Sequence, residues 1–338
     1  MINWFASDLF EGAGVILSIF FIIFLIRRGW KMYWVLLLAT VILALSNGQT
    51  LSYNSLLIYR SVTSYTAFYL ISMVVAITLL GHLHQKIGAM EQLVVSLRRL
   101  IHDPRALLMI FPAAVSLFST VPGGAIISAP MVEETGRDLK MSPTELAMSN
   151  IVYRHLIVLI TPFNSSLVLA AGITGISITS YLGFTVPVIA IVFAIAAVLL
   201  FSRYPRVDKK YSGDPEKAKK GRDLVNLLTV ASPYILAIFL GLACGVFFPV
   251  ALMVGIGACF FINLPEKDKP KALRNRLSIL IRGFNWPMAL STLIIVIYKD
   301  FMLEAESFQQ AVHYLVDQGL PVMVLIVALP FITGFITG

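Results

Sequence analysis

Short polar segments interrupt three of the long apolar runs in this sequence, and their residue types could bind a substrate or an ion. They are 119–124 (STVPGG), 161–166 (TPFNSS) and 333–338 (TGFITG). Proline removes a helix N–H donor and glycine relaxes the backbone, so each segment predicts a break in a membrane helix. A break at membrane depth presents free backbone N–H and C=O groups, and the N-terminus of a half-helix attracts anions. Hydroxyl, amide and carbonyl oxygens also suit Na⁺.

The same segments have an ordinary alternative, because small residues let membrane helices pack closely and proline often only kinks a helix. One such segment alone would favour packing, whereas three of them favour a binding site. The candidate substrate- or ion-binding residues within them are Ser119, Thr120, Gly123, Gly124, Thr161, Asn164, Ser165, Thr333 and Thr337.

Arg154 is the only Asp, Glu, Lys or Arg between Glu145 and Arg203. Asn150 lies four residues before it and Thr161 seven residues after it, so the three share one helix face. An arginine within a span is costly and marks a functional site by default. Its guanidinium could bind a substrate carboxylate through two hydrogen bonds, which makes Asn150 and Arg154 further candidate binding residues.

Two other interpretations of Arg154 remain open on sequence grounds. It could form a structural ion pair with Glu133 or Glu134, or it could extend to the headgroups from a shallower position in the membrane. His155 follows it and is a candidate for proton coupling, because the pKa of histidine is easily moved near neutrality. The same histidine could instead be a hydrogen bonder in helix packing.

The sequence predicts no catalytic residues and no metal ligands. A paired Asp/Asp within spans, a Ser/His dyad or an HExxH motif would indicate an intramembrane enzyme, and none of these patterns is evident in the sequence. His155 and Ser119 could in principle meet in space, which their spacing does not test. His82, His84 and His102 have no carboxylate or cysteine at a spacing that would complete a metal site. Cys244 and Cys259 form neither a CxxC nor a zinc spacing.

The composition is that of a multi-span membrane protein. Of the 338 residues, 58% are hydrophobic and only 13% are charged, whereas soluble domains are about 45–50% apolar and about 25% charged. The mean hydropathy of +0.85 excludes an ordinary soluble enzyme, a disordered chain and a secreted disulfide scaffold. The net charge of +8 is concentrated at 86–105, 203–222 and 267–282. The positive-inside rule places such clusters in cytoplasmic loops, and they are not interpreted as a nucleic-acid surface.

Runs of about 20 apolar residues predict helices that cross a lipid bilayer. The N-terminus is expected outside, because Asp8 and Glu11 precede the first run and Arg27, Arg28 and Lys31 follow it. The expected spans are 9–26, 33–46, 65–82, 144–178, 181–201, 226–244, 247–262 and 284–299.

Residues 104–134 are apolar but broken at 119–124, and they could form either a kinked full span or a re-entrant hairpin with both ends cytoplasmic. A full crossing would force three short spans into 146–201, whereas a hairpin leaves room there for two of full length. We therefore expect a hairpin at 104–134, followed by an interrupted helix at 143–178 and a span at 181–201.

The first part of the sequence resembles the second after a shift of 217 residues. The shift places 9–26 on 226–243, 33–46 on 250–263, and 65–82 on 282–299. An amphipathic helix expected on the membrane surface follows in each part, at 83–101 and at 301–319. The first of these should be cytoplasmic and the second on the outer face, because an inside loop separates the two parts and inverts one relative to the other.

The expected organisation is therefore two inverted repeats joined by a basic cytoplasmic loop. The first repeat occupies 1–201, the loop 202–225, and the second repeat 226–338, where it is truncated at its hairpin tip. A chain that ended there would leave polar backbone unpaired in lipid. We expect the full protein to be roughly 75–90 residues longer, with the second repeat ending near residue 418.

These features resemble the ion transporter superfamily, which includes dicarboxylate and citrate symporters, gluconate and lactate permeases, and arsenite transporters. STVPGGAIISAP at 119–130 and YRH at 153–155 are most similar to a prokaryotic integral-membrane family of unknown function with about ten predicted spans. The resemblance implies a midplane site made by hairpin tips and interrupted helices, which moves like an elevator against a dimer scaffold. The tip differs from the Ser-Asn-Thr of the dicarboxylate branch, so neither sodium coupling nor dicarboxylate specificity follows from it.

The sequence thus predicts an all-α polytopic membrane protein with inverted repeats, re-entrant hairpins and interrupted helices. The expected function is secondary active transport of a small carboxylate-like organic anion coupled to H⁺ or Na⁺, with an ion channel or an intramembrane enzyme as alternatives. No cofactor is expected apart from Na⁺ as a coupling ion. The expected partners are the anion and the bilayer of a prokaryotic cytoplasmic membrane, and 226–262 with 9–46 could form a homodimer face.

Overall fold

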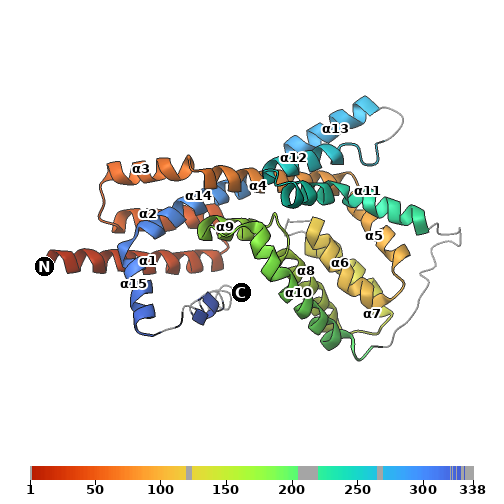
Figure 1. Ribbon diagram of the computed structural model, residues 1–338, viewed down its shortest axis with the longest axis horizontal. Helices are drawn as coiled ribbons and strands as arrows, with labels where there is room; N and C mark the ends of the chain where they lie inside the picture. Colours follow the sequence, from red (N-terminus) through yellow and green to blue (C-terminus); the bar gives the residue numbers. More distant parts are fainter. Residues whose placement is uncertain are drawn as a thin grey trace. The chain divides into compact units, whose positions relative to one another are not determined.

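The computed structural model describes residues 2–118, 124–204, 220–264 and 269–319, together with 321, 323–324, 326–328 and 331. Within these ranges every regular element is a helix (Figure 1). Among the described residues, four helices are long and apolar enough to cross a membrane: α4 (Tyr65–Lys86), α10 (Ile178–Phe201), α11 (Lys220–Ile238) with the π-helix η1 (Phe239–Ala243), and α14 (Trp286–Glu304). The expected all-α membrane architecture is confirmed.

The remaining apolar runs also form helices. They are α1 (Ile2–Arg27), α2 (Met32–Ser46), α6 (Pro104–Phe118) and α12 (Phe248–Cys259). The run at 144–178 divides into α8 (Pro143–Leu159) and α9 (Ser165–Thr174), so the expected interruption of this helix is confirmed. Each of the eight expected spans therefore coincides with helical structure.

Two helices occupy segments in which the sequence predicts no helix. One is α3 (Leu51–Val62), whose first turn is capped by Thr50, because the Thr50 hydroxyl accepts a hydrogen bond from Tyr53 N at 3.3 Å. The other is α13 (Lys269–Arg282), which contains most of the basic cluster at 267–282. A single arginine of α13, Arg276, is buried. Both helices are too polar on most of their surface for hydropathy to reveal them.

The expected surface helix at 83–101 is split in the structure. Residues 83–86 belong to the end of α4, and a separate helix, α5 (Ala89–Leu100), follows Gly88, whose φ of 73° favours glycine. The apolar face of α5 is buried in the protein against α11. The second expected surface helix is α15 (Glu306–Asp317), which begins after α14 ends and packs against α1.

The chain forms two compact units. The first unit, Met1–Ile71 with Asn285–Gly338, contains α1, α2, α3, α14 and α15, and α2 packs against both α1 and α14. The second unit, Ser72–Phe284, contains most of α4 and the helices from α5 to α13. Part of its core lies between α6, α7 (Gly124–Arg137), α8 and α10, where Leu108, Val132, Tyr153 and Ile189 are buried in one cluster.

Residues 104–137 fold back on themselves as a helical hairpin. Helices α6 and α7 pack against each other (Figure 1). Arg98, which precedes α6, makes two hydrogen bonds to the carboxylate of Glu134 in the last turn of α7, at 2.9 and 2.6 Å. The beginning of α6 and the end of α7 therefore lie at the same end of the second unit, which rules out one continuous rod.

Candidate functional site

The end of α6 and the end of α8 lie at the same level of the second unit. The Ser149 hydroxyl of α8 donates a hydrogen bond to Leu108 O of α6 at 2.9 Å. The two helices run in the same direction, because the chain reverses between α6 and α7 and again between α7 and α8. Phe118 and Leu159 each lie ten residues beyond these partners, a rise of about 15 Å. The hairpin tip begins after Phe118, and the α8–α9 break begins after Leu159. The tip and the break therefore begin at the same height along the parallel helices α6 and α8.

Several of the sequence-predicted site residues fall outside the part of the chain that the structure describes. These are Ser119, Thr120, Gly123, Thr333 and Thr337. Of the remaining candidates, Gly124 is the first residue of α7 and Ser165 is the first residue of α9. Two helices of the second unit thus begin at candidate residues, with the positive ends of their dipoles there.

Asn150 and Thr161 both have hydrogen-bond partners within the protein. The Ser128 hydroxyl donates to Asn150 Oδ1 at 2.6 Å and so connects α7 to α8. The Thr161 hydroxyl, which is buried, donates to Ile157 O at 2.8 Å and satisfies a carbonyl at the end of α8. Both contacts stabilise the packing around the hairpin and the break.

Asn164 is the N-cap of α9. Its Oδ1 accepts hydrogen bonds from Ser166 N at 2.8 Å and from Leu167 N at 3.4 Å. These are two of the backbone donors that the first turn of a helix leaves without intrahelical partners. The Asn164 side chain therefore occupies the donors that an anion would use, and a ligand at this helix end would have to displace it or bind beside it.

Arg154 is half-buried on α8, and within the described ranges its guanidinium has neither an ion pair nor a hydrogen bond. The two carboxylates considered as structural partners are engaged elsewhere. Glu133 binds Arg137 at 2.7 Å, and Glu134 binds Arg98 at 2.6 Å. Neither of the two expected carboxylates therefore binds Arg154 in the part of the chain that the structure describes. His155, its neighbour, is exposed, and its Nδ1 lies 2.7 Å from Ile151 O.

Ser116 is a candidate that the sequence pattern did not reveal. It lies in α6, two residues before that helix ends at Phe118, with 3% of its surface exposed. Its hydroxyl has no hydrogen-bond partner among the residues that the structure describes. Buried hydroxyls are usually hydrogen-bonded. Serine is common in packed membrane helices, so no sequence signal separates Ser116 from its neighbours.

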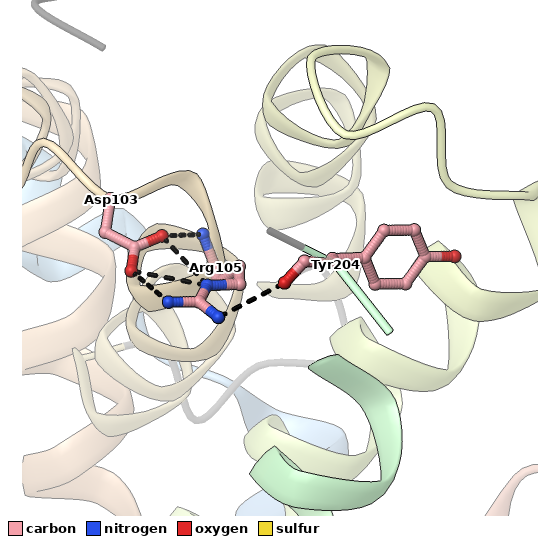
Figure 2. Close-up of polar contacts among 3 residues, drawn as sticks. All are labelled: Asp103, Arg105 and Tyr204. Carbon is pink, nitrogen blue, oxygen red and sulfur yellow. Dashed lines mark hydrogen bonds and ion pairs between the residues drawn. The ribbon is translucent and has the colours of Figure 1, made fainter. Parts of the chain in front are cut away.

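The opposite end of the second unit carries a set of ionic contacts that hold the hairpin in place. Arg105 donates hydrogen bonds to the Asp103 carboxylate, the shortest at 2.9 Å, and to Tyr204 O beyond α10 at 3.3 Å (Figure 2). Arg98 holds the pKa of the Glu134 carboxyl below its usual value, chiefly through their hydrogen bonds. These contacts fix the base of α6 and α7, while the ends at Phe118 and Gly124 lie away from them.

The described residues include no group of three or more His, Cys, Asp or Glu side chains that could hold a metal ion. A family model described as "Protein of unknown function (DUF401)" matches residues 12–338. No curated protein matches the sequence.

Proposed function

Since the chain belongs to this family, DUF401, whose description names no activity, we propose a function from its architecture and its broken helices. The protein is a secondary active transporter that moves a small organic anion of the carboxylate class, coupled to H⁺ or Na⁺. It lies in a prokaryotic cytoplasmic membrane with several spans and its N-terminus outside. A pair of chains forms the working unit.

The observation that carries this proposal is the position of Arg154 relative to the breaks. A cation without a partner in the described chain lies on α8, five residues before that helix ends at Leu159. The N-termini of α7 and α9 begin after the two breaks, and both attract negative charge. A small carboxylate would satisfy the guanidinium with two charge-assisted hydrogen bonds. The buried Ser116 hydroxyl supplies a further donor near the tip.

We also propose that the chain contains two inverted repeats of the ion transporter type. The helix bounds support this, because a shift of 217 residues places α5 (Ala89–Leu100) on α15 (Glu306–Asp317) residue for residue. It also brings α3 close to α13 and α4 close to α14. Repeats of this kind place broken helices from both halves around one midplane site.

Uptake into proteoliposomes tests the proposed function. The purified protein is reconstituted, and uptake of labelled lactate, succinate, citrate and gluconate is measured under imposed Na⁺ or H⁺ gradients. Arg154→Ala should reduce gradient-driven uptake about 10-fold to 100-fold, which corresponds to the loss of a hydrogen-bonded charge pair. Arg137→Ala is the matched control, because this arginine is exposed and its guanidinium binds the exposed Glu133 at 2.7 Å.

Three results would contradict the proposal. Uptake that is undiminished by Arg154→Ala would remove this residue from the site. Flux that follows the substrate gradient alone, with no accumulation, would indicate a channel. Chemical conversion of a carboxylate without any dependence on a gradient would indicate an intramembrane enzyme.

A further inference from the structure

A buried histidine, His84, lies in the second unit beside the helix that follows the basic loop. The side chain has no exposed surface. Its Nε2 lies 2.9 Å from Val230 O in α11, so the imidazole bridges α4 and α11. Its ring also meets the Tyr234 ring edge-on, with the centroids 5.3 Å apart. A titratable group is therefore enclosed between two membrane helices.

An aromatic contact connects this histidine to the break between α8 and α9. The Tyr234 ring lies 6.1 Å from the ring of Phe163, which is itself buried and belongs to the break. Phe163 directly precedes Asn164, the N-cap of α9. A displacement of Tyr234 would thus be transmitted through packed rings to the residue that covers the α9 N-terminus, because packed interiors transmit strain.

The charge state of His84 must affect how α4, α11 and the break pack together. A neutral imidazole with a proton on Nε2 donates to Val230 O, which fits the observed contact. Protonation would place a positive charge on a side chain with no exposed surface, and removing a charge from water is costly. Protonation therefore favours a second arrangement of these helices, in which the ring is less enclosed.

We propose that His84 is the proton-carrying group of this transporter. It takes a proton from water on one side of the membrane and releases it to water on the other side during the transport cycle. The titratable groups that face it are Tyr234 of α11 and Glu91 of α5. His82 and Lys86 are the neighbouring titratable groups on α4 itself, two residues before and after it. This inference rests on the proposed transport function, and it assigns the coupling to H⁺ and to His84 in place of His155.

The test compares His84→Gln with wild type in Na⁺-free proteoliposomes. A glutamine side-chain N–H can replace the donor to Val230 O, but glutamine does not titrate. The probe is whichever of lactate, succinate, citrate and gluconate the wild type accumulates most. Two rates are measured: uptake driven by a pH gradient, and exchange of labelled for unlabelled probe at equal pH. Lumenal pyranine reports proton entry during uptake.

The wild type should acidify the lumen during uptake. A pH gradient of about two units should strongly stimulate uptake, because each pH unit is about a tenfold ratio of proton concentration across the membrane. In His84→Gln the stimulation of uptake by the pH gradient should be at least tenfold smaller than in wild type, to order of magnitude. The exchange rate of this variant should stay within about twofold of wild type. The matched controls are His82→Gln and His155→Gln, which should keep both the stimulation and the proton entry.

Several outcomes would overturn the inference. If His84→Gln keeps the response to the pH gradient, then His84 does not carry the proton. If both His84→Gln and His84→Asn lose exchange as well, the side chain has a structural role only. Wild-type uptake that depends on Na⁺ without lumenal acidification would leave the transport function standing and reject proton coupling. Wild type that accumulates no probe at all would reject the function itself.

Discussion

Arg276 of α13 binds three backbone carbonyls at the place where α12 ends. Its Nη1 donates to Phe260 O at 2.6 Å and to Cys259 O at 3.2 Å, and its Nη2 donates to Asn263 O at 3.0 Å. The last carbonyls of a helix have no intrahelical donors and carry partial negative charge. The buried guanidinium therefore satisfies these acceptors and holds α13 against the end of α12.

Replacing Arg276 by Met should destabilise the protein. The change removes the guanidinium donor from the buried Cys259 O and from the part-buried Phe260 O and Asn263 O, and we expect a loss of about 2–4 kcal/mol in the free energy of unfolding. Arg274→Met is the control, because this arginine lies on the same helix and is exposed. Thermal unfolding in detergent, followed by circular dichroism, measures both variants. Equal melting temperatures for the two variants would contradict the assigned role of Arg276.

At the residue scale, the sequence singles out a candidate most readily where the residue type is unusual for its surroundings. Arg154 stands out in sequence as an isolated charge, and the structure adds that Glu133 and Glu134 have other partners. The position of Asn164 as the N-cap of α9 was not predicted, since a capping asparagine and a ligand asparagine look alike in sequence. The burial of His84 depends on contacts with α11, far along the chain, which local patterns do not record.

At the scale of elements, α11 and α12 approach each other closely through a glycine. A Cβ added to Gly255 would lie 2.6 Å from Pro233 O, a backbone atom that cannot rotate away. Pro233 interrupts the helical hydrogen bonds of α11, and the Ser232 hydroxyl donates to Thr229 O at 2.7 Å, the carbonyl that proline leaves without a donor. Close backbone approach through small residues is a common way for membrane helices to pack.

Gly255→Ala should force α12 away from α11 and lower the free energy of unfolding by about 1–3 kcal/mol. Gly257→Ala, two residues later on the same helix, is the control, because a Cβ there has nothing within 4 Å. The control should be neutral or slightly stabilising, since alanine is the better helix former. Melting temperatures in detergent distinguish the two, and an unchanged Gly255→Ala would contradict the close packing.

The positions of helices could be predicted wherever the length of an apolar run was enough to identify a helix. The hairpin followed from counting how many spans fit before the basic loop, and the fold of α6 against α7 agrees with it. Helices α3 and α13 were not predicted because each buries few residues. Their stability depends on contacts with other helices, which a hydropathy pattern does not contain. The short gap at 87–88 between α4 and α5 was not predicted, because apolar residues recur at helical spacing through both helices and across the gap.

At the scale of the whole molecule, each compact unit combines helices that the 217-residue shift assigns to different halves. In the second unit, α5 packs against α11, and Arg99 of α5 binds the buried Asp223 of α11 at 3.3 Å. In the first unit, α15 packs against α1, and Glu11 of α1 accepts a hydrogen bond from Ser307 N at 3.1 Å. Both units thus use a contact between the first helix of one half and the amphipathic helix of the other.

The proposed inversion of the halves predicts on which side of the membrane each amphipathic segment lies. Single cysteines at Arg137 and Gln318 are introduced after Cys244 and Cys259 have been replaced by Ala. A membrane-impermeant maleimide should label Gln318→Cys in intact cells and Arg137→Cys only in inverted vesicles. The 217-residue shift places Ile101 on Gln318. The contact of Arg98 with Glu134 puts the end of α5 at the same end of the second unit as Arg137. An inverted pair places equivalent segments on opposite faces.

Labelling of both positions from the same side would reject the inverted arrangement. The sequence supported this prediction through the order of its elements. The sequence could not show that α5 packs against α11 or that α15 packs against α1, because these contacts join positions more than a hundred residues apart.

The pairing of α5 with α11 also has a consequence for synthesis. On a nascent chain, α5 is complete about 120 residues before α11 begins, and at about 5–20 residues per second that interval is about 6–24 s. Throughout it, the apolar stripe that α11 will cover stays without its partner. The ribosome-bound intermediate should therefore depend on insertion factors or chaperones to cover that stripe, and slow codons within the basic loop would prolong this dependence.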